Sequence, residues 1–302
     1  MLEFKEITLA DKPWMQPLFA MSDFNSEEYN FTFTYIWRRV FRYTAARMGD
    51  YLIIKSSRAT HPPSYLFPAG TGDIAPVLAA LKEDAAANEA ELVFHTVLAP
   101  SVKLLETMYP GQFVFLPLND YFDYVYNAQS LITLAGKKLH SKRNHINRFR
   151  QNYPDWSYEA FTPENLPEVI LMNEEWNRIH GQDADRSMID EAISVRVAIR
   201  DFFFLGMDGG LIRAGGRVVA FSMGDRLNSD TYLVHIEKAF SDVQGAYAAI
   251  NQEFAAHNCE DYLYINREDD SGEEGLRKAK LSYRPVFQVE KFGAKWIGAG
   301  EL

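Results

Sequence analysis

The sequence predicts an α/β protein of two similar domains, each a mixed, mostly antiparallel sheet flanked by helices. Its 302 residues suffice for two domains of about 150 residues each. The order of predicted elements in the first half recurs in the second half, which indicates a duplication. A helix with one apolar stripe joins the two halves. We therefore expect an N-terminal domain at residues 1–126 and a C-terminal domain at residues 127–302, the second including the connecting helix.

The first half is predicted to contain a strand, a helical stretch, a three-strand meander, and then helix, strand, helix and strand pair. Thr8 and Asp11 have the spacing of a capping box, which marks the first helix start. Gly49-Asp50 separates two alternating segments, as in a hairpin. The predicted elements are strand Leu2–Ile7, a helical stretch to Arg39, strands Phe41–Met48, Tyr51–Ser56 and Tyr65–Phe67, helix Ile74–Asn88, strand Leu92–Leu98, helix Ser101–Met108 and a strand pair within Phe113–Tyr126.

The second half repeats this plan with two helices after its first strand. Thr162 is a suitable N-cap, and Pro163 suits the first helical position. Gly215-Gly216 predicts a tight hairpin. The predicted elements are strand Trp156–Phe161, helices ending near His180 and Phe204, strands Gly210–Ala214, Arg217–Arg226 and Thr231–Glu237, a helix from Gln244 to His257, strand Tyr262–Ile265, helix Glu273–Leu281 and strand Val286–Lys291.

Composition limits the possible functions and locations. Acidic residues outnumber basic ones by 41 to 31, for a formal charge of −10, which argues against a general nucleic-acid coat or a polybasic membrane protein. The single cysteine, Cys259, excludes an intramolecular disulfide and suits a reducing compartment. No signal-peptide pattern opens the sequence, and no stretch approaches the ~20 apolar residues that cross a bilayer. We expect a cytoplasmic protein without a transmembrane segment, able to contact a membrane surface.

The connecting helix, Gly136 to Pro154, is basic in an acidic chain, and no acidic residue occurs from Tyr124 to Pro154. Its apolar stripe, which should pack against a domain, consists of Leu139, Ile146, Phe149 and Tyr153. Lysine and arginine hold phosphates, so this helix is predicted to bind a polyanionic donor. The predicted donor-binding cations are Lys138, Lys142, Arg143 and Arg148. The alternative is a solvated basic helix that pairs with acidic neighbours.

A second candidate is the helix start at Gln244, Gly245 and Ala246, directly after a predicted strand. The first N–H groups of a helix are unpaired and attract anions, and glycine permits the close approach of a pyrophosphate. These residues are therefore assigned to donor binding, the alternative being a helix start that needs a small residue. The corresponding run of the first half, Pro68 to Asp73, begins with proline, so we expect that domain to be a degenerate, supporting copy.

Polar residues follow two further strands of the second half. Asn266, Arg267 and Glu268 leave the end of a strand, where open sheets present binding groups; the alternative is a surface turn. His235 and Glu237 share one face of the preceding strand. We predict the proton acceptor among His235, Glu237 and Glu268, while Tyr283 returns a proton to the leaving group. His235 alone also fits a hydrogen-bonded core histidine. Asn266, Arg267, Arg277 and Lys278 are added to the donor-binding set.

Several other chemistries have no motif here. The sequence contains no Gly-x-Ser-x-Gly elbow around Ser222, no Walker lysine loop and no Cys/His metal-ligand spacing. We predict no metal ion, no tightly bound cofactor and no covalent intermediate.

Three strings resemble one known family. They are GKKLHSKRNHINRF, HIEKAF with QGAYAAIN, and INREDDSGEEGLRKAKLSYRP, spread from Gly136 to Pro285. They are similar to the family that shares the C-terminal catalytic domain of bacterial phosphatidylglycerol lysyltransferases. That resemblance implies two tandem acyltransferase domains of the GNAT type, related in architecture to the FemABX peptidyltransferases. It also implies transfer of an acyl group, from aminoacyl-tRNA or a coenzyme A thioester, to an amine or hydroxyl of a lipid head group or small molecule.

The competing hypothesis is a binding module whose basic helix docks nucleic acid or an acidic partner without catalysis. The two differ in where the polar residues of the second half lie. If Glu237, Asn266 and Glu268 face a crevice with the basic helix at its rim, an enzyme is favoured. If they face open solvent, a binding module is favoured. The sequence does not indicate an oligomeric state.

Overall fold

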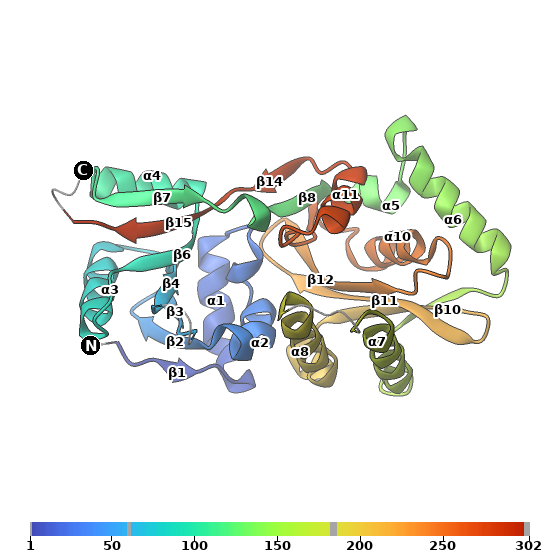
Figure 1. Cartoon of the computed structure of the whole chain (residues 1–302), viewed down its shortest axis with the longest axis horizontal. Coiled ribbons are helices and arrows are strands. Elements are labelled where there is room, and N and C mark those ends of the chain that lie inside the picture. Colours follow the sequence, from blue (N-terminus) through green and yellow to red (C-terminus); the bar gives the residue numbers. More distant parts are fainter. Residues whose placement is uncertain (1, 59–61, 182–185, 299–302) are drawn as a thin grey trace. The chain divides into compact units, whose positions relative to one another are not determined.

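The structure is a computed structural model, and it describes residues 2–58, 62–181 and 186–298 (Figure 1). The chain forms two compact units. Unit 1 comprises the chain up to Asp123, the segment Asp269–Gly272 and the segment that begins at Gln288. Unit 2 comprises Tyr124–Glu268 and Glu273–Phe287. The first division falls at Asp123, close to the expected boundary at residue 126, and two later segments return to unit 1.

Unit 1 holds an eight-stranded sheet in the order β1-β2-β3-β4-β6-β15-β7, with β5 paired to β3. Its neighbouring strands pair antiparallel, except β4 with β6, which run parallel. Its strands are β1 Lys5–Glu6, β2 Tyr43–Met48, β3 Tyr51–Ser56, β4 Ser64–Leu66, β5 Ala69–Gly70, β6 Val93–Leu98, β7 Phe113–Pro117 and β15 Lys291–Trp296. Its helices are α1 Lys12–Ser22, α2 Phe31–Phe41, α3 Ala75–Ala87 and α4 Ala99–Met108.

Unit 2 holds a seven-stranded sheet in the order β14-β8-β13-β12-β11-β10-β9. Strands β12 and β13 run parallel, whereas β9 with β10, β10 with β11, β11 with β12 and β8 with β13 are antiparallel. Its strands are β8 Asp123–Asn127, β9 Ser157–Ala160, β10 Asp208–Ala214, β11 Arg217–Arg226, β12 Thr231–Ala239, β13 Tyr264–Asn266 and β14 Phe287–Val289. Its helices are α5 Ala128–Thr133, α6 His140–Asn152, α7 Leu166–His180, α8 Arg186–Arg200, α9 Phe202–Leu205, α10 Ala246–Asn258 and α11 Glu274–Ser282. Helix α10 covers one face of this sheet, and α7 and α8 cover the other (Figure 1).

Strands β8 and β15 pair with partners that were not predicted from the sequence. The predicted pairing of the two strands within Phe113–Tyr126 is wrong, because β7 pairs with β15 and β8 pairs with β13. The predicted last strand, Val286–Lys291, is in fact two strands, β14 and β15. Strand β15 lies between β6 and β7 in unit 1. In each sheet, the later strand of the parallel pair therefore has a strand from a distant part of the chain on its other side: β15 beside β6, and β8 beside β13.

Local signals at several element ends are confirmed with small shifts. Thr8 and Asp11 form the predicted capping box, with the Thr8 N–H donating to Asp11 Oδ2 at 2.7 Å. The predicted helix start at Thr162 and Pro163 is wrong by one turn. The Thr162 hydroxyl accepts from the Asn165 N–H at 3.3 Å, and α7 begins only at Leu166. The Thr162 side chain thus closes a turn that precedes the helix.

The connecting helix is present as α6, with its apolar side buried as predicted. Leu139, Ile146 and Phe149 are at most 5% exposed. Leu139 and Ile146 belong to the same core as Tyr124, Tyr126 and residues of α10. Across the described ranges, no helix is long and apolar enough to cross a bilayer.

Candidate active site

The polar residues of unit 2 meet where its two parallel strands stop pairing. Strand β12 pairs with β13 only from Thr231 to Leu233, opposite Tyr264 to Asn266. Beyond that point β12 continues to Ala239, while the chain after β13 turns away. Side chains from the last part of β12 and from the loop after β13 therefore fill the space that the diverging strands leave.

Glu237 on β12 is held at both carboxylate oxygens. Its Oε1 lies 2.9 Å from an Arg267 guanidinium nitrogen, and its Oε2 accepts from the Asn251 amide at 2.9 Å. Both partners of the ion pair are nearly buried, with side chains 12% and 11% exposed. Charge-assisted hydrogen bonds in such surroundings are short and strong, so this pair is fixed in place before any ligand binds.

Arg267 keeps one nitrogen free of protein acceptors. Its second terminal nitrogen, Nη1, is buried and has no hydrogen-bond partner in the part of the chain that the structure describes. The guanidinium carbon lies 4.9 Å from the centre of the Tyr283 ring and 5.6 Å from that of Tyr126. Burial opposes the charge of Arg267, but Glu237 and the two tyrosines raise its pKa. The result is a permanent, buried cation with an unused donor, as in sites that bind a developing oxyanion.

The tyrosine beside Arg267 is covered by a second cation. The Lys142 ammonium of α6 lies 3.9 Å from the centre of the Tyr283 ring. Burial and the neighbouring Arg267 lower the pKa of Lys142, against the opposite effect of Glu237. Burial raises the pKa of Tyr283 above its ordinary value, so this phenol keeps its proton at neutral pH. Lys142 is the point at which the basic helix reaches the cluster of Glu237 and Arg267.

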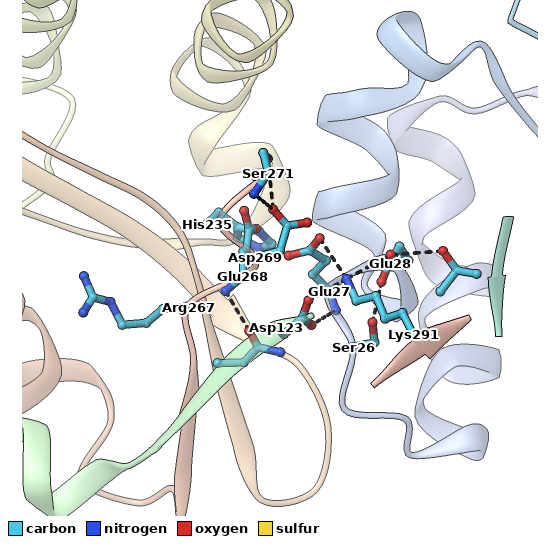
Figure 2. A network of polar contacts seen from close by, with 12 residues as sticks. Ser26, Glu27, Glu28, Asp123, His235, Arg267, Glu268, Asp269, Ser271 and Lys291 are labelled. Carbon is cyan, nitrogen blue, oxygen red and sulfur yellow. Dashed lines mark hydrogen bonds and ion pairs between the residues drawn. The ribbon is translucent and has the colours of Figure 1, made fainter. Parts of the chain in front are cut away.

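His235, two residues before Glu237, is clamped between two carboxylates. Its Nδ1 lies 3.0 Å from Glu268 Oε1 and its Nε2 lies 3.0 Å from Asp225 Oδ1, and its side chain is fully buried. Figure 2 shows His235 beside Glu268, with the Arg267 side chain pointing away from them. Burial alone would lower the pKa of His235, but the two carboxylates, Asp225 foremost, raise it to about 9. The imidazole is therefore doubly protonated at neutral pH and has no lone pair with which to accept a proton.

A charged His235 predicts a pH dependence of stability. Its pKa is about 9 when folded and 6.5 in the unfolded reference, so between these pH values the native state holds the extra proton. The free energy of unfolding should therefore fall by about 1.4 kcal/mol per pH unit as the pH rises through this window. Urea denaturation at pH 6.5 to 9 measures this slope. His235→Gln should remove it, and an unchanged slope in that variant would contradict the assignment.

The loop after β13 is shaped by its own first residue and by β8. The Asn266 side chain is fully buried, and its oxygen accepts from the Glu268 N–H at 2.7 Å. Tyr124 of β8 exchanges backbone hydrogen bonds with Arg267 and Glu268. Glu268 has a positive φ of 57°, a conformation that costs a non-glycine residue about 1 kcal/mol. This turn directs Glu268 toward His235 while Arg267 points toward Glu237.

The predicted cations of the basic helix have different surroundings. Arg143 donates to the backbone oxygens of Leu134 and Gly136, and Lys142 covers Tyr283. Lys138 and Arg148 are exposed. Outside the predicted set, Arg150 pairs with Glu253 at 2.9 Å. The helix is therefore partly structural and partly a free basic surface.

The predicted helix start at Gly245 is packed against the basic helix. Gly245 is the N-cap of α10 with φ +89°, and a Cβ there would lie 2.4 Å from the backbone oxygen of His145 and 2.9 Å from Phe149 Cβ. Ala246 is fully buried and donates its N–H to Val243. Gln244 is exposed. The absence of a side chain at Gly245 lets α6 approach α10 closely. Atoms of α6 occupy the space that a Cβ at this position would need.

This contact predicts a large cost for Gly245→Ala. The variant combines a left-handed backbone, worth about 1 to 2 kcal/mol, with overpacking against α6, worth about 1 to 3 kcal/mol. Gly215→Ala is the matched control, since Gly215 has φ +57° and nothing within 4 Å of a Cβ. Chemical denaturation should show Gly245→Ala to be the more destabilising by at least 1 kcal/mol. Equal losses would mean that α6 does not pack on this glycine.

Helix α11 holds the remaining predicted donor-binding residues. Lys278 is exposed and pairs with Glu274 at 2.7 Å, and Arg277 is half-buried on the same helix. The neighbouring Lys280 is buried, and its ammonium donates to the backbone oxygen of Arg267 at 2.6 Å. Lys280 thus supports the Arg267 loop, a role that sequence reasoning missed.

Three further residues of the site were missed. Asp225 holds His235, Asn251 holds Glu237, and Tyr126 packs on Arg267. Asn251 left a signal, because it is an amide in the otherwise apolar first turns of α10. Asp225 left a weaker one, as an acidic residue near the end of the long strand β11. Tyr126 had no such signal, because its strand was predicted to belong to the first half, whereas it lies in the sheet of unit 2.

Unit 1 contains its own buried ionic cluster around Lys291 (Figure 2). The Lys291 ammonium is fully buried and lies 3.1 Å from Glu27, 3.0 Å from Glu28 and 2.5 Å from Asp123. Among the described residues, Glu27, Asp123 and Asp269 are the one group with oxygens close enough to share a metal ion. Because the ammonium already contacts Glu27 and Asp123, their negative charge is compensated within the protein.

Comparison with known proteins places this geometry in context. A family model described as "Phosphatidylglycerol lysyltransferase, C-terminal" matches residues 19–295. An uncharacterized protein of Mycoplasmoides gallisepticum is 24% identical over 183 residues, which is 58% of this chain and 56% of that protein. The chain thus spans little more than half the length of that curated relative.

Solved structures agree with the family match. A conserved protein of unknown function from Bacteroides thetaiotaomicron is 39% identical, with a TM-score of 0.94 over 98% of this chain and 100% of that one. A C-terminal domain assigned to a lysylphosphatidylglycerol synthetase from Agrobacterium fabrum is 14% identical, with a TM-score of 0.66 over 97% and 94% of the two chains. FemX and a tandem GNAT protein of clavulanic acid biosynthesis share the fold at TM-scores of 0.60 and 0.51, with 10% and 9% identity over 96% and 100% of both chains, respectively. The predicted fold class and family resemblance are confirmed.

Proposed function

The chain belongs to the phosphatidylglycerol lysyltransferase C-terminal family, and we propose that it is an acyltransferase or aminoacyltransferase whose unit 2 moves an aminoacyl group from aminoacyl-tRNA to an amine or hydroxyl acceptor. The acceptor class is a lipid head group or a small molecule. Because charged tRNA is made in the cytoplasm, that is where we propose the protein acts.

The observation that carries this proposal is the preorganised Arg267. Acyl transfer passes through a tetrahedral state whose carbonyl oxygen becomes negative, and a fixed donor in a water-poor site stabilises that charge. Arg267 Nη1 is buried with no acceptor among the described residues, while Glu237 fixes the other side of the guanidinium. We assign Nη1 to the oxyanion.

Glu237 is the proposed proton acceptor. The acceptor's nitrogen or oxygen forms a bond to the acyl carbon, the bond from that carbon to the ribose oxygen of the tRNA breaks, and the nucleophile's proton passes to Glu237. Tyr283, whose raised pKa keeps it protonated, gives its proton to the leaving ribose oxygen, and proton exchange with solvent then returns Glu237 and Tyr283 to their starting states. His235 and Glu268 are then positioning residues, because the charged imidazole fixes the loop that holds Arg267.

The surroundings of the helix start favour tRNA over coenzyme A as the donor. At Gly245, the space that close approach of a pyrophosphate would use is filled by the backbone of α6, and Ala246 already donates its N–H within the turn. The exposed cations lie instead along α6, at Lys138 and Arg148. A basic helix surface suits the extended phosphate backbone of a nucleic acid.

Burial supports an enzyme over the competing binding module. Glu237 and Glu268 have side chains 12% and 19% exposed, and Asn266 is fully buried. None of the three faces open solvent, which is where a module would leave them. Asn266 accepts from the Glu268 N–H and Glu237 pairs with Arg267, so their contacts hold the Arg267 loop rather than a surface.

Unit 1 is proposed to be a supporting copy. Its parallel pair is β4 with β6, and Thr96 of β6 donates to Glu28 of the Lys291 cluster at 3.2 Å. In its glycine-containing run, a Cβ at Gly70 would lie 2.0 Å from the Asp50 backbone oxygen, whereas a Cβ at Gly72 would meet nothing within 4 Å. In unit 1, the polar side chains near the parallel pair are therefore paired with one another in the Lys291 cluster and are not available to an acyl donor.

Binding measurements test the donor assignment. Purified protein should retain a pool of charged tRNA in filter binding and show no comparable retention of acetyl-CoA. In Lys138→Glu/Arg148→Glu, the affinity should fall and the slope of log affinity against log salt should shrink by about two, one for each lost phosphate contact. Lys103→Glu/Arg39→Glu in unit 1, which replaces two other exposed cations, is the matched control.

Two results would contradict the proposal. Equal charged-tRNA binding by wild type and the α6 variant across the salt series would remove α6 as the donor surface. Retention of the thioester, without tRNA, would assign the donor to coenzyme A.

A further inference from the structure

A cavity of about 220 Å³ is lined by residues of α7 and α8. These two helices lie on the sheet face opposite α10 (Figure 1). The cavity lining includes Trp176, Asn177, His180, Met188, Ile189 and Arg196. None of these side chains takes part in the Glu237 and Arg267 cluster. The volume corresponds to roughly seven water molecules, which is enough for a small ligand or one end of a larger one.

The aromatic wall of this cavity is fixed to the end of β12. The Trp176 indole N–H donates to the Ala239 backbone oxygen at 3.1 Å, and the Lys238 ammonium lies 3.5 Å from the centre of the indole ring. Lys238 also pairs with Glu191 of α8 at 3.2 Å. His180 stacks on Trp176 at 4.1 Å. The wall is therefore rigid, and it is anchored at the two residues that follow Glu237.

Two hydrogen-bond donors of the cavity have no protein acceptor. The Asn177 amide nitrogen is buried and unpartnered, and the Arg196 side chain is exposed with no ion pair, both with respect to the described residues. An unsatisfied buried donor costs about 1 to 3 kcal/mol. Such a cost is recovered when a ligand brings an acceptor oxygen, and a guanidinium favours a ligand oxygen that carries negative charge.

The remaining wall is apolar and extends to the surface. Ile189 and Ile193 are one turn apart on α8 and remain 49% and 37% exposed, and both line the cavity. Apolar side chains at the mouth of a pocket suit a ligand whose charged end is followed by methylene groups.

We propose that this cavity binds an anionic group, a carboxylate or phosphate, carried on an apolar chain. Asn177 and Arg196 donate to the anion, and Ile189 and Ile193 contact the chain. Binding itself is independent of the transfer reaction, whereas identifying this ligand as the acceptor rests on the proposed function. The head group of an anionic lipid and a small soluble phosphate monoester or carboxylate with an alkyl chain share this chemistry.

Calorimetric titration with butyl phosphate, butyrate and 1-butanol tests the proposal. The wild type should bind both anions and discriminate against the neutral alcohol. Asn177→Asp, which keeps the shape of the side chain but repels anions, should weaken anion binding at least tenfold, and Arg196→Gln should weaken it as well. Gln16→Glu and Arg178→Gln, at exposed positions outside the cavity, are the matched controls and should bind like the wild type.

Several outcomes would overturn the proposal. They are no anion binding by the wild type, equal binding of the alcohol, or full anion binding by Asn177→Asp. Flotation with phosphatidylglycerol vesicles, against phosphatidylcholine vesicles, separates the two sources. Flotation lost in Asn177→Asp assigns the lipid, and anion binding without flotation assigns a soluble ligand. Charged-tRNA retention by the same variants reports separately on the proposed function.

Discussion

Replacing Arg267 by lysine is expected to lower kcat/KM for acyl transfer by about 10²- to 10³-fold, the cost of removing one oxyanion donor. Lysine preserves the positive charge beside Glu237 but lacks the second guanidinium nitrogen, which is buried with no acceptor in the described ranges. The protein should therefore still fold, while the hydrogen-bond donor to the oxyanion is lost. Transfer assays that use the acyl donor identified by filter binding measure the effect.

The control for this variant is Arg178→Lys, at an exposed arginine on α7 that pairs with Glu175. It makes the same chemical change away from the cluster and should leave kcat/KM unchanged. Charged-tRNA retention should also persist in Arg267→Lys. If Arg267→Lys transferred the acyl group at the wild-type rate, the oxyanion assignment would be wrong, and Arg267 would serve only to hold Glu237.

Replacing Lys291 by methionine should destabilise the protein by about 3 to 5 kcal/mol, the range for breaking a buried ionic network. Methionine has a similar length, so the loss comes from the carboxylates of Glu27, Glu28 and Asp123, which would remain buried without their cation. Such a loss approaches the whole stability of a typical domain. Urea denaturation followed by tryptophan fluorescence measures it.

The same strand supplies the control. Lys295 lies four residues further along β15 and pairs with Glu91 at 2.6 Å, but both side chains are at least half exposed. Exposed pairs contribute about 0 to 1 kcal/mol, so Lys295→Met should have little effect. Similar losses in the two variants would show that the cost arises from strand packing and not from the uncompensated carboxylates.

The sequence predicted the local parts of the fold because they have local causes. The Thr8 capping box, the hairpin turns at Gly49 and Gly215, and the apolar stripe of α6 each depend on residues close together in the chain. The pairing of β7 and β8 was wrong because it depends on β15, far along the sequence. No local pattern in β7 distinguishes one antiparallel neighbour from another.

The candidate site was predictable to a similar degree. Glu237 was singled out because it shares one face of a central strand with His235, and Arg267 because it leaves the end of a strand, where open sheets present binding groups. The structure brings the two together. The partners that decide their chemistry were harder to find. Asp225 determines the protonation of His235, and Asn251 holds Glu237, but each contact requires the register of β11 against β12 or the docking of α10. Those are tertiary facts that spacing along one strand does not contain.

The place of β15 in the sheet of unit 1 has a consequence for biosynthesis. Strands β6 and β7 are made early, but the strand that pairs with both of them, Lys291–Trp296, follows all of unit 2 in the sequence. While the ribosome translates unit 2, the nascent unit 1 therefore exposes two unsatisfied strand edges, and such edges favour aggregation. Chaperone protection during translation, and not after release, is then the stage at which this chain needs help most.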